Sequence, residues 1–427
     1  MESANWLEKD KKYVWHPFTQ ALTADDNIVI ERAESCTLFA SDGKEYIDAN
    51  SSWWVNVHGH CHPHIQEAII NQVSVLDHTI FAGATHPQAI KLAERICQIL
   101  PATFKKVFFS DNGSTAVEVA LKMVFQYWYN KNLPKKRIIA LEGAYHGDTF
   151  GAMAVGERGY FNQPFEHFFF DVDYIPFPTK TNESEVLSQF KTLLESGEIA
   201  AIIVEPLIQG SAGMRVYSPE FLDELIVLSH RFEALVIFDE VMTAWGRTGR
   251  LFAMNHCFQT PDIVCLSKGL TGGVLPLGLT VATEEIYEAF LSKDKLKALL
   301  HGHSFTGNAL SCAAANASLD IFETPETWES IELIEKKHIE FAGRLSHEKK
   351  VKDIAVFGTI IRFEIETGEG NTYFSSIRDE AYRFFIENGC LIRPLGNVIF
   401  LNPPYSISED ELDKLYSVIL GFLRKLD

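Results

Sequence analysis

Short apolar runs alternate with amphipathic segments through the middle of the chain. The runs are four to six residues long and bounded by turn-forming residues, as in strands buried on both faces of a parallel sheet. The segments between them carry apolar residues at helical spacing. This alternation predicts one mostly parallel, doubly wound α/β sheet with right-handed crossovers. The strands are expected at residues 106–110, 137–141, 200–204, 235–239 and 263–266, and the alternation continues to about residue 285.

The two ends of the chain have a different pattern. Asp42-Gly43 lies between two short strand-like runs, which favours a β-hairpin. Near the C-terminus, Ser408 and Glu411 form a capping box for a last amphipathic helix. Between residues 327 and 401 the pattern predicts a charged helix followed by strands, and hence a smaller α+β domain that the N-terminal strands join. The expected division is an N-terminal arm with strands (1–60), a large domain (61–325) and a small C-terminal domain (326–427).

Charged side chains stand where two of the central strands end. Asp239 closes one strand, and Lys268 follows the next one 29 residues later, which leaves room for one crossover. In open α/β sheets, ligands bind beyond the carboxyl ends of the strands. A lysine that can form a Schiff base beside a buried carboxylate suits pyridoxal 5'-phosphate, because the carboxylate keeps the pyridine nitrogen protonated. For these two residues alone, a structural ion pair explains the pattern equally well.

A turn of small residues joins strand 106–110 to the helix that follows. Gly113 and Ser114 fall at the start of this helix, where free backbone N–H groups and the helix dipole favour an anion such as phosphate. Serine and threonine can also act there as simple N-caps. The chain contains neither a Gly-x-Gly-x-x-Gly nor a P-loop motif. Combined with the aromatic Tyr145, Asp239 and Lys268, this turn indicates a flat, phosphorylated ring held by a lysine.

The composition of the chain limits which kinds of binding partner are expected. The chain has 427 residues, of which 46% are hydrophobic, and its formal net charge is −19. Without a basic patch, a nucleic-acid partner is not expected. No apolar run approaches a membrane span and the first residues lack the apolar core of a signal peptide, so we expect no membrane partner and a cytoplasmic location. Seven scattered cysteines without a Cys-x-x-Cys pair indicate free thiols, with Cys265 and Cys312 buried.

Four histidines spaced by two superficially resemble a metal cluster. On a strand they would share one face, but Gly59 and Pro63 interrupt a strand there and no acidic ligand is near in the sequence. A turn that leads into a helix at 63–76 is the preferred interpretation, and no metal site is expected. The histidines are His58, His60, His62 and His64.

Three motifs carry a resemblance to a known family: Phe238-Asp239-Glu240-Val241, Trp245-Gly-Arg247-Thr-Gly249 and Leu266-Ser-Lys268-Gly. Over nearly its whole length the chain resembles the class III (ornithine-type) aminotransferases, which are fold-type-I pyridoxal phosphate enzymes. Further stretches narrow the resemblance to the branch of biotin biosynthesis that transfers an amino group from S-adenosylmethionine to 8-amino-7-oxononanoate. These stretches are Trp15-His-Pro-Phe-Thr19, Ser51-Ser-Trp-Trp54, Tyr145-His-Gly-Asp-Thr-Phe-Gly-Ala-Met153, Gly213-Met-Arg215, His301-Gly302, Ala313-Ala-Ala-Asn-Ala-Ser-Leu319 and Ile392-Arg-Pro394.

The resemblance implies roles around the cofactor. Lys268 would form the Schiff base with the cofactor and, once displaced, act as the general base. Asp239 would hold the pyridinium N–H through a charge-assisted hydrogen bond. Gly113 and Ser114 would bind the phosphate, and Tyr145 would stack on the ring.

The resemblance also implies a shared site. Ser304 stands where the family usually has threonine, a phosphate ligand that reaches across from the other subunit, and His303 beside it would contribute backbone. A homodimer with shared active sites is therefore expected. Trp53 and Gly302 match positions that line the substrate pocket, and Trp54 either lines it or packs nearby.

Four further residues match positions linked to the substrate. Arg393 matches the arginine that pairs with the substrate carboxylate, as bidentate geometry favours, and Asp148 matches an acid that would attract an amine. Arg247 belongs to the motif either as a substrate contact or as a structural partner. Phe18 departs from the family, because described members carry tyrosine there; the aromatic face survives and the hydroxyl is lost.

Three alternatives remain open. The same cofactor residues would serve an ω-amino-acid or diamine aminotransferase, an aminomutase or a decarboxylase of this fold. Lysine could replace S-adenosylmethionine as the amino donor. A cofactor-binding scaffold without catalysis is the third, against which the complete set of lysine, acid and phosphate-binding turn argues.

Overall fold

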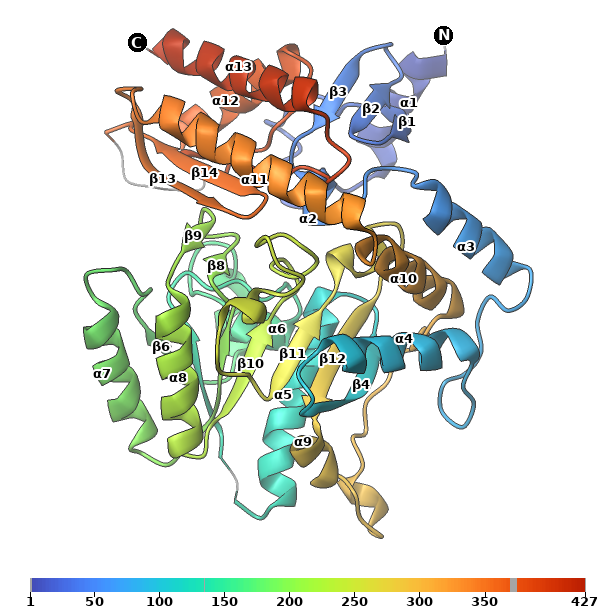
Figure 1. Ribbon diagram of the computed structural model, residues 1–427, viewed down its shortest axis with the longest axis vertical. Helices are drawn as coiled ribbons and strands as arrows, with labels where there is room; N and C mark the ends of the chain where they lie inside the picture. The colour runs from blue at the N-terminus through green and yellow to red at the C-terminus, as the bar shows by residue number, and fades with distance from the viewer. Residues whose placement is uncertain (1, 134, 369–374, 427) are drawn as a thin grey trace.

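A seven-stranded sheet forms the centre of the larger part of the molecule (Figure 1). The structure is a computed structural model that describes residues 2–133, 135–368 and 375–426. The strand order is β4-β12-β11-β10-β7-β5-β6, and only β12 runs antiparallel to its neighbours. The mostly parallel, doubly wound sheet expected from the sequence is therefore confirmed. The strands are β4 (Phe104–Ser110), β5 (Arg137–Leu141), β6 (Val172–Ile175), β7 (Ile199–Val204), β10 (Leu235–Asp239), β11 (Ile263–Leu266) and β12 (Gly278–Thr283).

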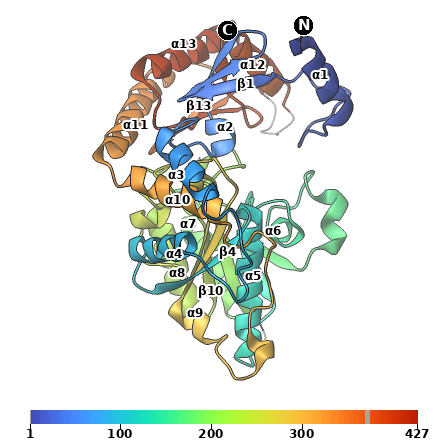
Figure 2. The same ribbon diagram turned by 90° about the vertical axis from the view of Figure 1, so that its right-hand side faces the viewer.

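Both faces of this sheet are covered, which explains the continuous apolar runs. Along β10, Val236 and Phe238 join the core formed with α7 and α8, whereas Leu235 and Ile237 join the core formed with α5. Figure 2 shows α5 on one side of the sheet and α7 and α8 on the other. The helices of this part are α3 (Pro63–Val73), α4 (Pro87–Ile99), α5 (Gly113–Asn130), α6 (Phe150–Ala154), α7 (Glu183–Leu194), α8 (Pro219–Arg231), α9 (Glu284–Glu288) and α10 (Ala309–Phe322).

Two smaller sheets lie above the large one in Figure 1, together with the C-terminal helices. The first has the order β1-β2-β3-β15, and the parallel pairing of β15 with β3 joins the two ends of the chain. The second has the order β13-β14-β16. The elements are α1 (Glu2–Tyr13), β1 (Ile30–Glu34), β2 (Thr37–Ala40), β3 (Glu45–Asp48), α2 (Ser51–Trp54), α11 (Pro325–Leu345), β13 (Val351–Phe357), β14 (Ile360–Ile365), α12 (Ser376–Glu387), β15 (Cys390–Leu391), β16 (Val398–Leu401) and α13 (Glu409–Leu426), while a separate ribbon pairs β8 (Ile208–Gln209) with β9 (Arg215–Val216).

Several local predictions are confirmed. The Asp42-Gly43 turn joins the antiparallel β2 and β3. The capping box before α13 is present, since the backbone N–H of Glu411 donates to Ser408 Oγ and the N–H of Ser408 donates to Glu411 Oε2. Cys265 and Cys312 are buried free thiols. Within the described ranges, no helix combines the length and the apolarity that crossing a bilayer requires.

The histidines of segment 58–64 take separate partners. His58 Nε2 lies 3.0 Å from Ser318 Oγ, His60 Nε2 lies 2.8 Å from Asp48 Oδ2, and His64 Nε2 lies 3.0 Å from Asp320 Oδ2. The expectation that no acid is near was therefore wrong. It failed because Asp48 and Asp320 reach these histidines through the fold and not through local sequence.

Candidate active site

A cavity of about 380 Å³ lies beyond the carboxyl ends of the central strands. Parallel strands and the helices that follow them direct their connecting loops to this edge. Six of the residues singled out in the sequence line the cavity, namely Trp54, Gly113, Ser114, Tyr145, Asp239 and Lys268. Further lining comes from Asn112, His146, Gly147, Glu205, Ser267 and the segment 273–277.

Lys268 begins a short 3-10 helix directly after β11, with a φ of 48°. Its Nζ lies 4.6 Å from the centre of the Trp54 ring. Among the residues that the structure describes, no hydrogen bond or ion pair of Nζ is found. Burial lowers the pKa of this amine to about 8, and the negative charges of Asp239 and Glu205 oppose the shift only in part. The amine is therefore poised to act as a nucleophile near neutral pH.

Asp239 faces the same cavity and is fixed by two donors. The N–H of Val241 donates to Oδ1 over 3.1 Å, and Nδ1 of His146 lies 2.8 Å from Oδ2. His146 is fully buried. The sequence analysis included this histidine only within the motif 145–153 and assigned it no role, and its position directly after Tyr145 was the one available signal.

The start of α5 forms an anion-binding turn. Asn112 caps the helix by accepting a 2.9 Å hydrogen bond from the N–H of Thr115. Ser114 is therefore not the cap, and its Oγ accepts only a 3.2 Å hydrogen bond from the N–H of Asp148. A Cβ at Gly147, whose φ is 123°, would lie 2.1 Å from Ser114 Oγ, and one at Gly113 would lie 2.7 Å from Val241 Cγ1. Glycine at both positions therefore allows segment 147–148 to approach Ser114 and allows the start of α5 to approach Val241.

Tyr145 and Glu205 form the wall next to this turn. The Tyr145 hydroxyl donates to Asp148 Oδ2 over 2.9 Å, and its backbone N–H donates to Glu205 Oε1 over 3.1 Å. Burial raises the pKa of the Tyr145 phenol. It also raises the pKa of Glu205 to about 7. Sequence reasoning did not single out Glu205, because an acid before proline carries no distinctive motif.

Phe18, Trp53 and Arg393 form a second group, which we call the aromatic-arginine cluster. The Phe18 ring lies 5.7 Å from the Trp53 ring, and Arg393 Cζ lies 5.2 Å from the Trp53 ring centre. These residues do not line the cavity itself. Arg393 is exposed, and no carboxylate pairs with its guanidinium within the described part of the chain. Asn50 links the cluster to the cavity wall by accepting a 2.7 Å hydrogen bond from the N–H of Arg393.

Asp148 does not line the cavity, and neither do the three neighbouring predicted residues Gly302, His303 and Ser304. His303 Nδ1 is 3.1 Å from Asp111 Oδ2, the Ser304 carbonyl accepts a 2.7 Å hydrogen bond from His78 Nε2, and a Cβ at Gly302 would meet open space. Arg247 is also outside the cavity. Its guanidinium is buried and donates to the carbonyls of Pro403 and Asn402, which favours the structural interpretation.

Comparison with known proteins places the chain in a family. The family model Aminotransferase class-III matches residues 20–423. The chain belongs to the class III aminotransferases. It is therefore an enzyme of the transaminase class, as the motifs around Asp239 and Lys268 indicated.

Individual relatives share most of the length of the chain. A protein from Synechococcus elongatus named adenosylmethionine-8-amino-7-oxononanoate aminotransferase is 44% identical over 97% of this chain and 99% of its own. One of the same name from Aquifex aeolicus is 38% identical over 99% of this chain and 98% of its own. The crystal structure of another, from Methanocaldococcus jannaschii, superposes with a TM-score of 0.94 at 37% identity and covers 99% of both chains.

The cavity residues of this aminotransferase suit pyridoxal phosphate. Lys268 offers a buried amine, Asp239 offers an oriented carboxylate, and the turn at Gly113 and Ser114 leaves backbone N–H groups and a hydroxyl for an anion. The observed donor set therefore matches an aldehyde, a pyridinium nitrogen and a phosphate in one molecule.

Proposed function

We propose that this chain transfers an amino group from S-adenosylmethionine to 8-amino-7-oxononanoate to give 7,8-diaminononanoate, a step of biotin biosynthesis. The observation that carries the proposal is the shared name of relatives that match nearly the whole chain at 36–44% identity. The two half-reactions use one site in turn, so the donor product leaves before the acceptor binds. Pyridoxal 5'-phosphate, when bound, would supply the aldehyde that takes up the amino group and the electron-withdrawing ring that stabilises negative charge at the substrate carbon.

The cavity residues have different roles in the proposed reaction. Lys268 attaches the cofactor and then moves the proton at the substrate carbon that carries the nitrogen. Asp239 keeps the ring nitrogen protonated, and Tyr145 packs against the ring. Gly113 and Ser114 hold the phosphate. The lowered pKa of Lys268 supports its role, because a neutral amine is both the nucleophile and the base.

The aromatic-arginine cluster binds the substrate chain. Arg393 pairs with the carboxylate of 8-amino-7-oxononanoate, while Trp53 and Phe18 cover its methylene groups and Trp54 closes the cavity side. Support comes from the exposed guanidinium, which the Trp53 ring orients. Asp148, placed by the Tyr145 hydroxyl, attracts the substrate ammonium.

We further propose a cytoplasmic homodimer with shared sites. Three predicted residues, Gly302, His303 and Ser304, lie outside the cavity of their own chain. This position supports a role for them in binding the cofactor phosphate and the substrate of the partner subunit. In this assembly, residues 61–325 form the cofactor-binding domain, and residues 1–60 join the small domain 326–427. The pairing of β3 with β15 supports this division.

Absorption spectroscopy with purified holoenzyme tests the reaction. S-adenosylmethionine should remove the visible band of the lysine-bound cofactor, and 8-amino-7-oxononanoate should restore it with release of 7,8-diaminononanoate. Repeating the measurement with lysine in place of S-adenosylmethionine shows which of the two is the amino donor. A fully loaded enzyme whose band neither donor bleaches would overturn the proposal, and transfer from ω-amino acids or diamines alone would assign the chain to the alternative branch. Complementation of a biotin auxotroph provides an independent check.

A further inference from the structure

The segment Ser51–Trp54 contains two tryptophans and has unusual backbone dihedral angles. Ser51, Ser52 and Trp54 have φ values of 49°, 60° and 65°, in the region that side chains other than glycine rarely adopt. Trp54 lies against Lys268, and Trp53 lies against Phe18 and Arg393. A backbone of this kind persists only where its surroundings fix it. A small relaxation at Ser52 would move the next residue, Trp53.

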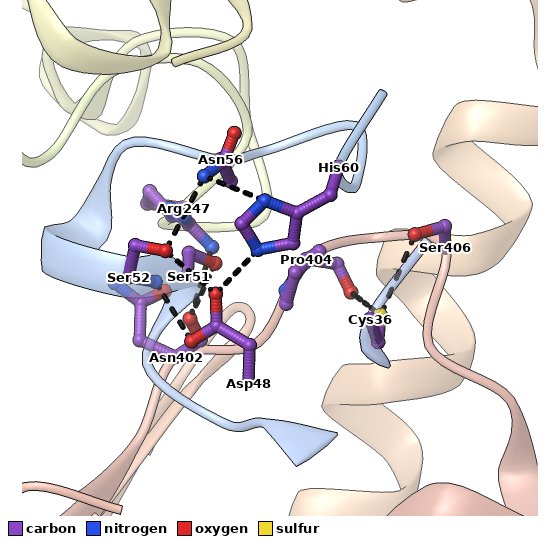
Figure 3. Close-up of polar contacts among 10 residues, drawn as sticks. All are labelled: Cys36, Asp48, Ser51, Ser52, Asn56, His60, Arg247, Asn402, Pro404 and Ser406. Atoms are coloured by element: carbon purple, nitrogen blue, oxygen red, sulfur yellow. Dashed lines mark hydrogen bonds and ion pairs between the residues drawn. The ribbon is translucent and has the colours of Figure 1, made fainter. Parts of the chain in front are cut away.

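A buried carboxylate fixes the segment from behind. Asp48, whose side chain is fully buried, accepts hydrogen bonds from the N–H of Ser52 over 2.7 Å and from its hydroxyl over 2.9 Å. The third contact of the carboxylate is His60 Nε2 at 2.8 Å. Figure 3 shows these side chains converging on Asp48 from the two sides of the segment. Ser52 is therefore held at both its main chain and its side chain.

His60 closes the network on the far side of the tryptophans. Its Nδ1 lies 3.3 Å from Asn56 Nδ2, which also lies 3.4 Å from Ser52 Oγ (Figure 3). A proton on Nε2 lets His60 donate to Asp48 and accept from Asn56, so that both ring nitrogens are satisfied. The main chain of His60 is itself anchored, because its N–H and C=O pair with Ser35. His60 thus links Asp48, which precedes the segment, to Asn56, which follows it.

We infer that His60 and Asp48 are positioning residues for the acceptor side of the site, acting through Ser52 on Trp53. Neither lines the cavity. The inference rests on the proposed function, in which Trp53 and Arg393 bind the acceptor. The spacing of the four histidines superficially suggested a metal site. The inference gives His60 a positioning role instead. Loss of the His60 contact should weaken acceptor binding while the cofactor remains in place.

Arg247 makes His60 the better residue to vary than Asp48. Burial lowers the pKa of the Arg247 guanidinium, and the nearby Asp48 carboxylate partly opposes this shift. The Nε and Nη2 of Arg247 have no hydrogen-bond partner within the described ranges. Neutralising Asp48 would also remove the compensating charge for Arg247, which mixes a stability effect with the positioning effect. A change at His60 leaves the Asp48 charge intact.

The matched pair His60→Gln and His60→Leu tests the inference in the holoenzyme. Glutamine can still donate to Asp48 and accept from Asn56, whereas leucine of similar volume can do neither. For His60→Leu we expect KM for the acceptor to rise on the order of tenfold, with an unchanged cofactor content per chain and an unchanged rate of the donor half-reaction. For His60→Gln we expect KM within about twofold of the wild type.

A double-mutant cycle separates positioning from general destabilisation. Combined with Trp53→Ala, His60→Leu should add little to the acceptor KM, because the residue through which it acts is gone. Fully additive effects, or a His60→Leu variant with wild-type KM, would overturn the inference. If His60→Leu does not fold, Ser52→Ala removes one hydroxyl contact to Asp48 and must raise the acceptor KM in the same direction. Wild-type enzyme that transfers no amino group to 8-amino-7-oxononanoate would refute the proposed function instead, and the cycle is then measured with the acceptor that it does use.

Discussion

His146 and Asp239 form a buried pair at the cavity, with 2.8 Å between Nδ1 and Oδ2. Their side chains are 0% and 6% exposed. The other ring nitrogen of His146 is buried and has no hydrogen-bond partner within the described part of the chain. The pair fixes one oxygen of Asp239 while the N–H of Val241 fixes the other. The orientation of this carboxylate is therefore set before any cofactor arrives.

Removing the His146 donor should weaken cofactor binding. His146→Leu is expected to lower the affinity of the apoenzyme for pyridoxal phosphate on the order of tenfold, as for one hydrogen bond to a charged group. His146→Asn keeps a donor near the position of Nδ1 and should bind almost as tightly as the wild type. Asp239→Asn should hold the cofactor poorly and lose turnover. Spectroscopic titration of the three variant apoenzymes measures their affinities for pyridoxal phosphate. Wild-type affinity in His146→Leu would contradict the role of the pair.

The pH dependence of cofactor attachment should report the buried amine of Lys268. Burial lowers the pKa of this group to about 8. Because only the neutral amine attacks, the attachment rate should rise about tenfold per pH unit below that value and level off above it. Stopped-flow absorbance of apoenzyme mixed with pyridoxal phosphate gives the profile, with Lys268→Ala as the blank. A rate that still climbs at pH 10 would mean an ordinary, exposed lysine.

Glu205 should make the apoenzyme less stable as pH rises. Its pKa is raised from 4.5 to about 7 by burial. The folded chain therefore binds this proton more tightly than the unfolded chain, so its contribution is complete below pH 4.5 and is lost as pH rises through about 7. The slope from one such group is at most about 1.4 kcal/mol per pH unit.

Thermal unfolding of wild type and Glu205→Gln between pH 5 and 8 isolates this slope. The free energy of unfolding of the variant should fall less steeply with pH, because glutamine does not titrate. Glu240, whose pKa burial also raises to about 7, stays in both proteins and cancels in the difference. Parallel curves for the two proteins would show that Glu205 is already ionised at pH 5.

The sequence predicted the parts of this site that depend on local pattern. Apolar runs and helical spacing located the strand ends, and these placed Asp239, Lys268 and Gly113 at one edge, where the structure has them. Contacts between distant segments were beyond such reasoning. His146 meets Asp239 across 93 residues and Arg393 meets Asn50 across 343, and no periodicity encodes either pairing.

The same limit explains the histidine segment. A local window shows His60 without an acid, yet the return of the chain after β3 brings Asp48 within 2.8 Å. A two-residue spacing carries information about a shared face only if the segment is a strand. Gly59 and the turn before α3 remove that condition, so His58, His60 and His64 each have a separate partner.

Arg393 should decide whether the site accepts a carboxylate. Arg393→Met keeps much of the packing on Trp53 but removes the charge, and we expect KM for 8-amino-7-oxononanoate to rise on the order of tenfold. The methyl ester of this substrate supplies the matched control. Wild-type enzyme should prefer the acid over the ester by about the same factor, because a carboxylate accepts two parallel charge-assisted hydrogen bonds from the guanidinium and an ester does not. In Arg393→Met this preference should vanish while the donor half-reaction keeps its rate. A variant that still discriminates between acid and ester would place the carboxylate at another cation and leave Arg393 as a support for the Trp53 ring alone.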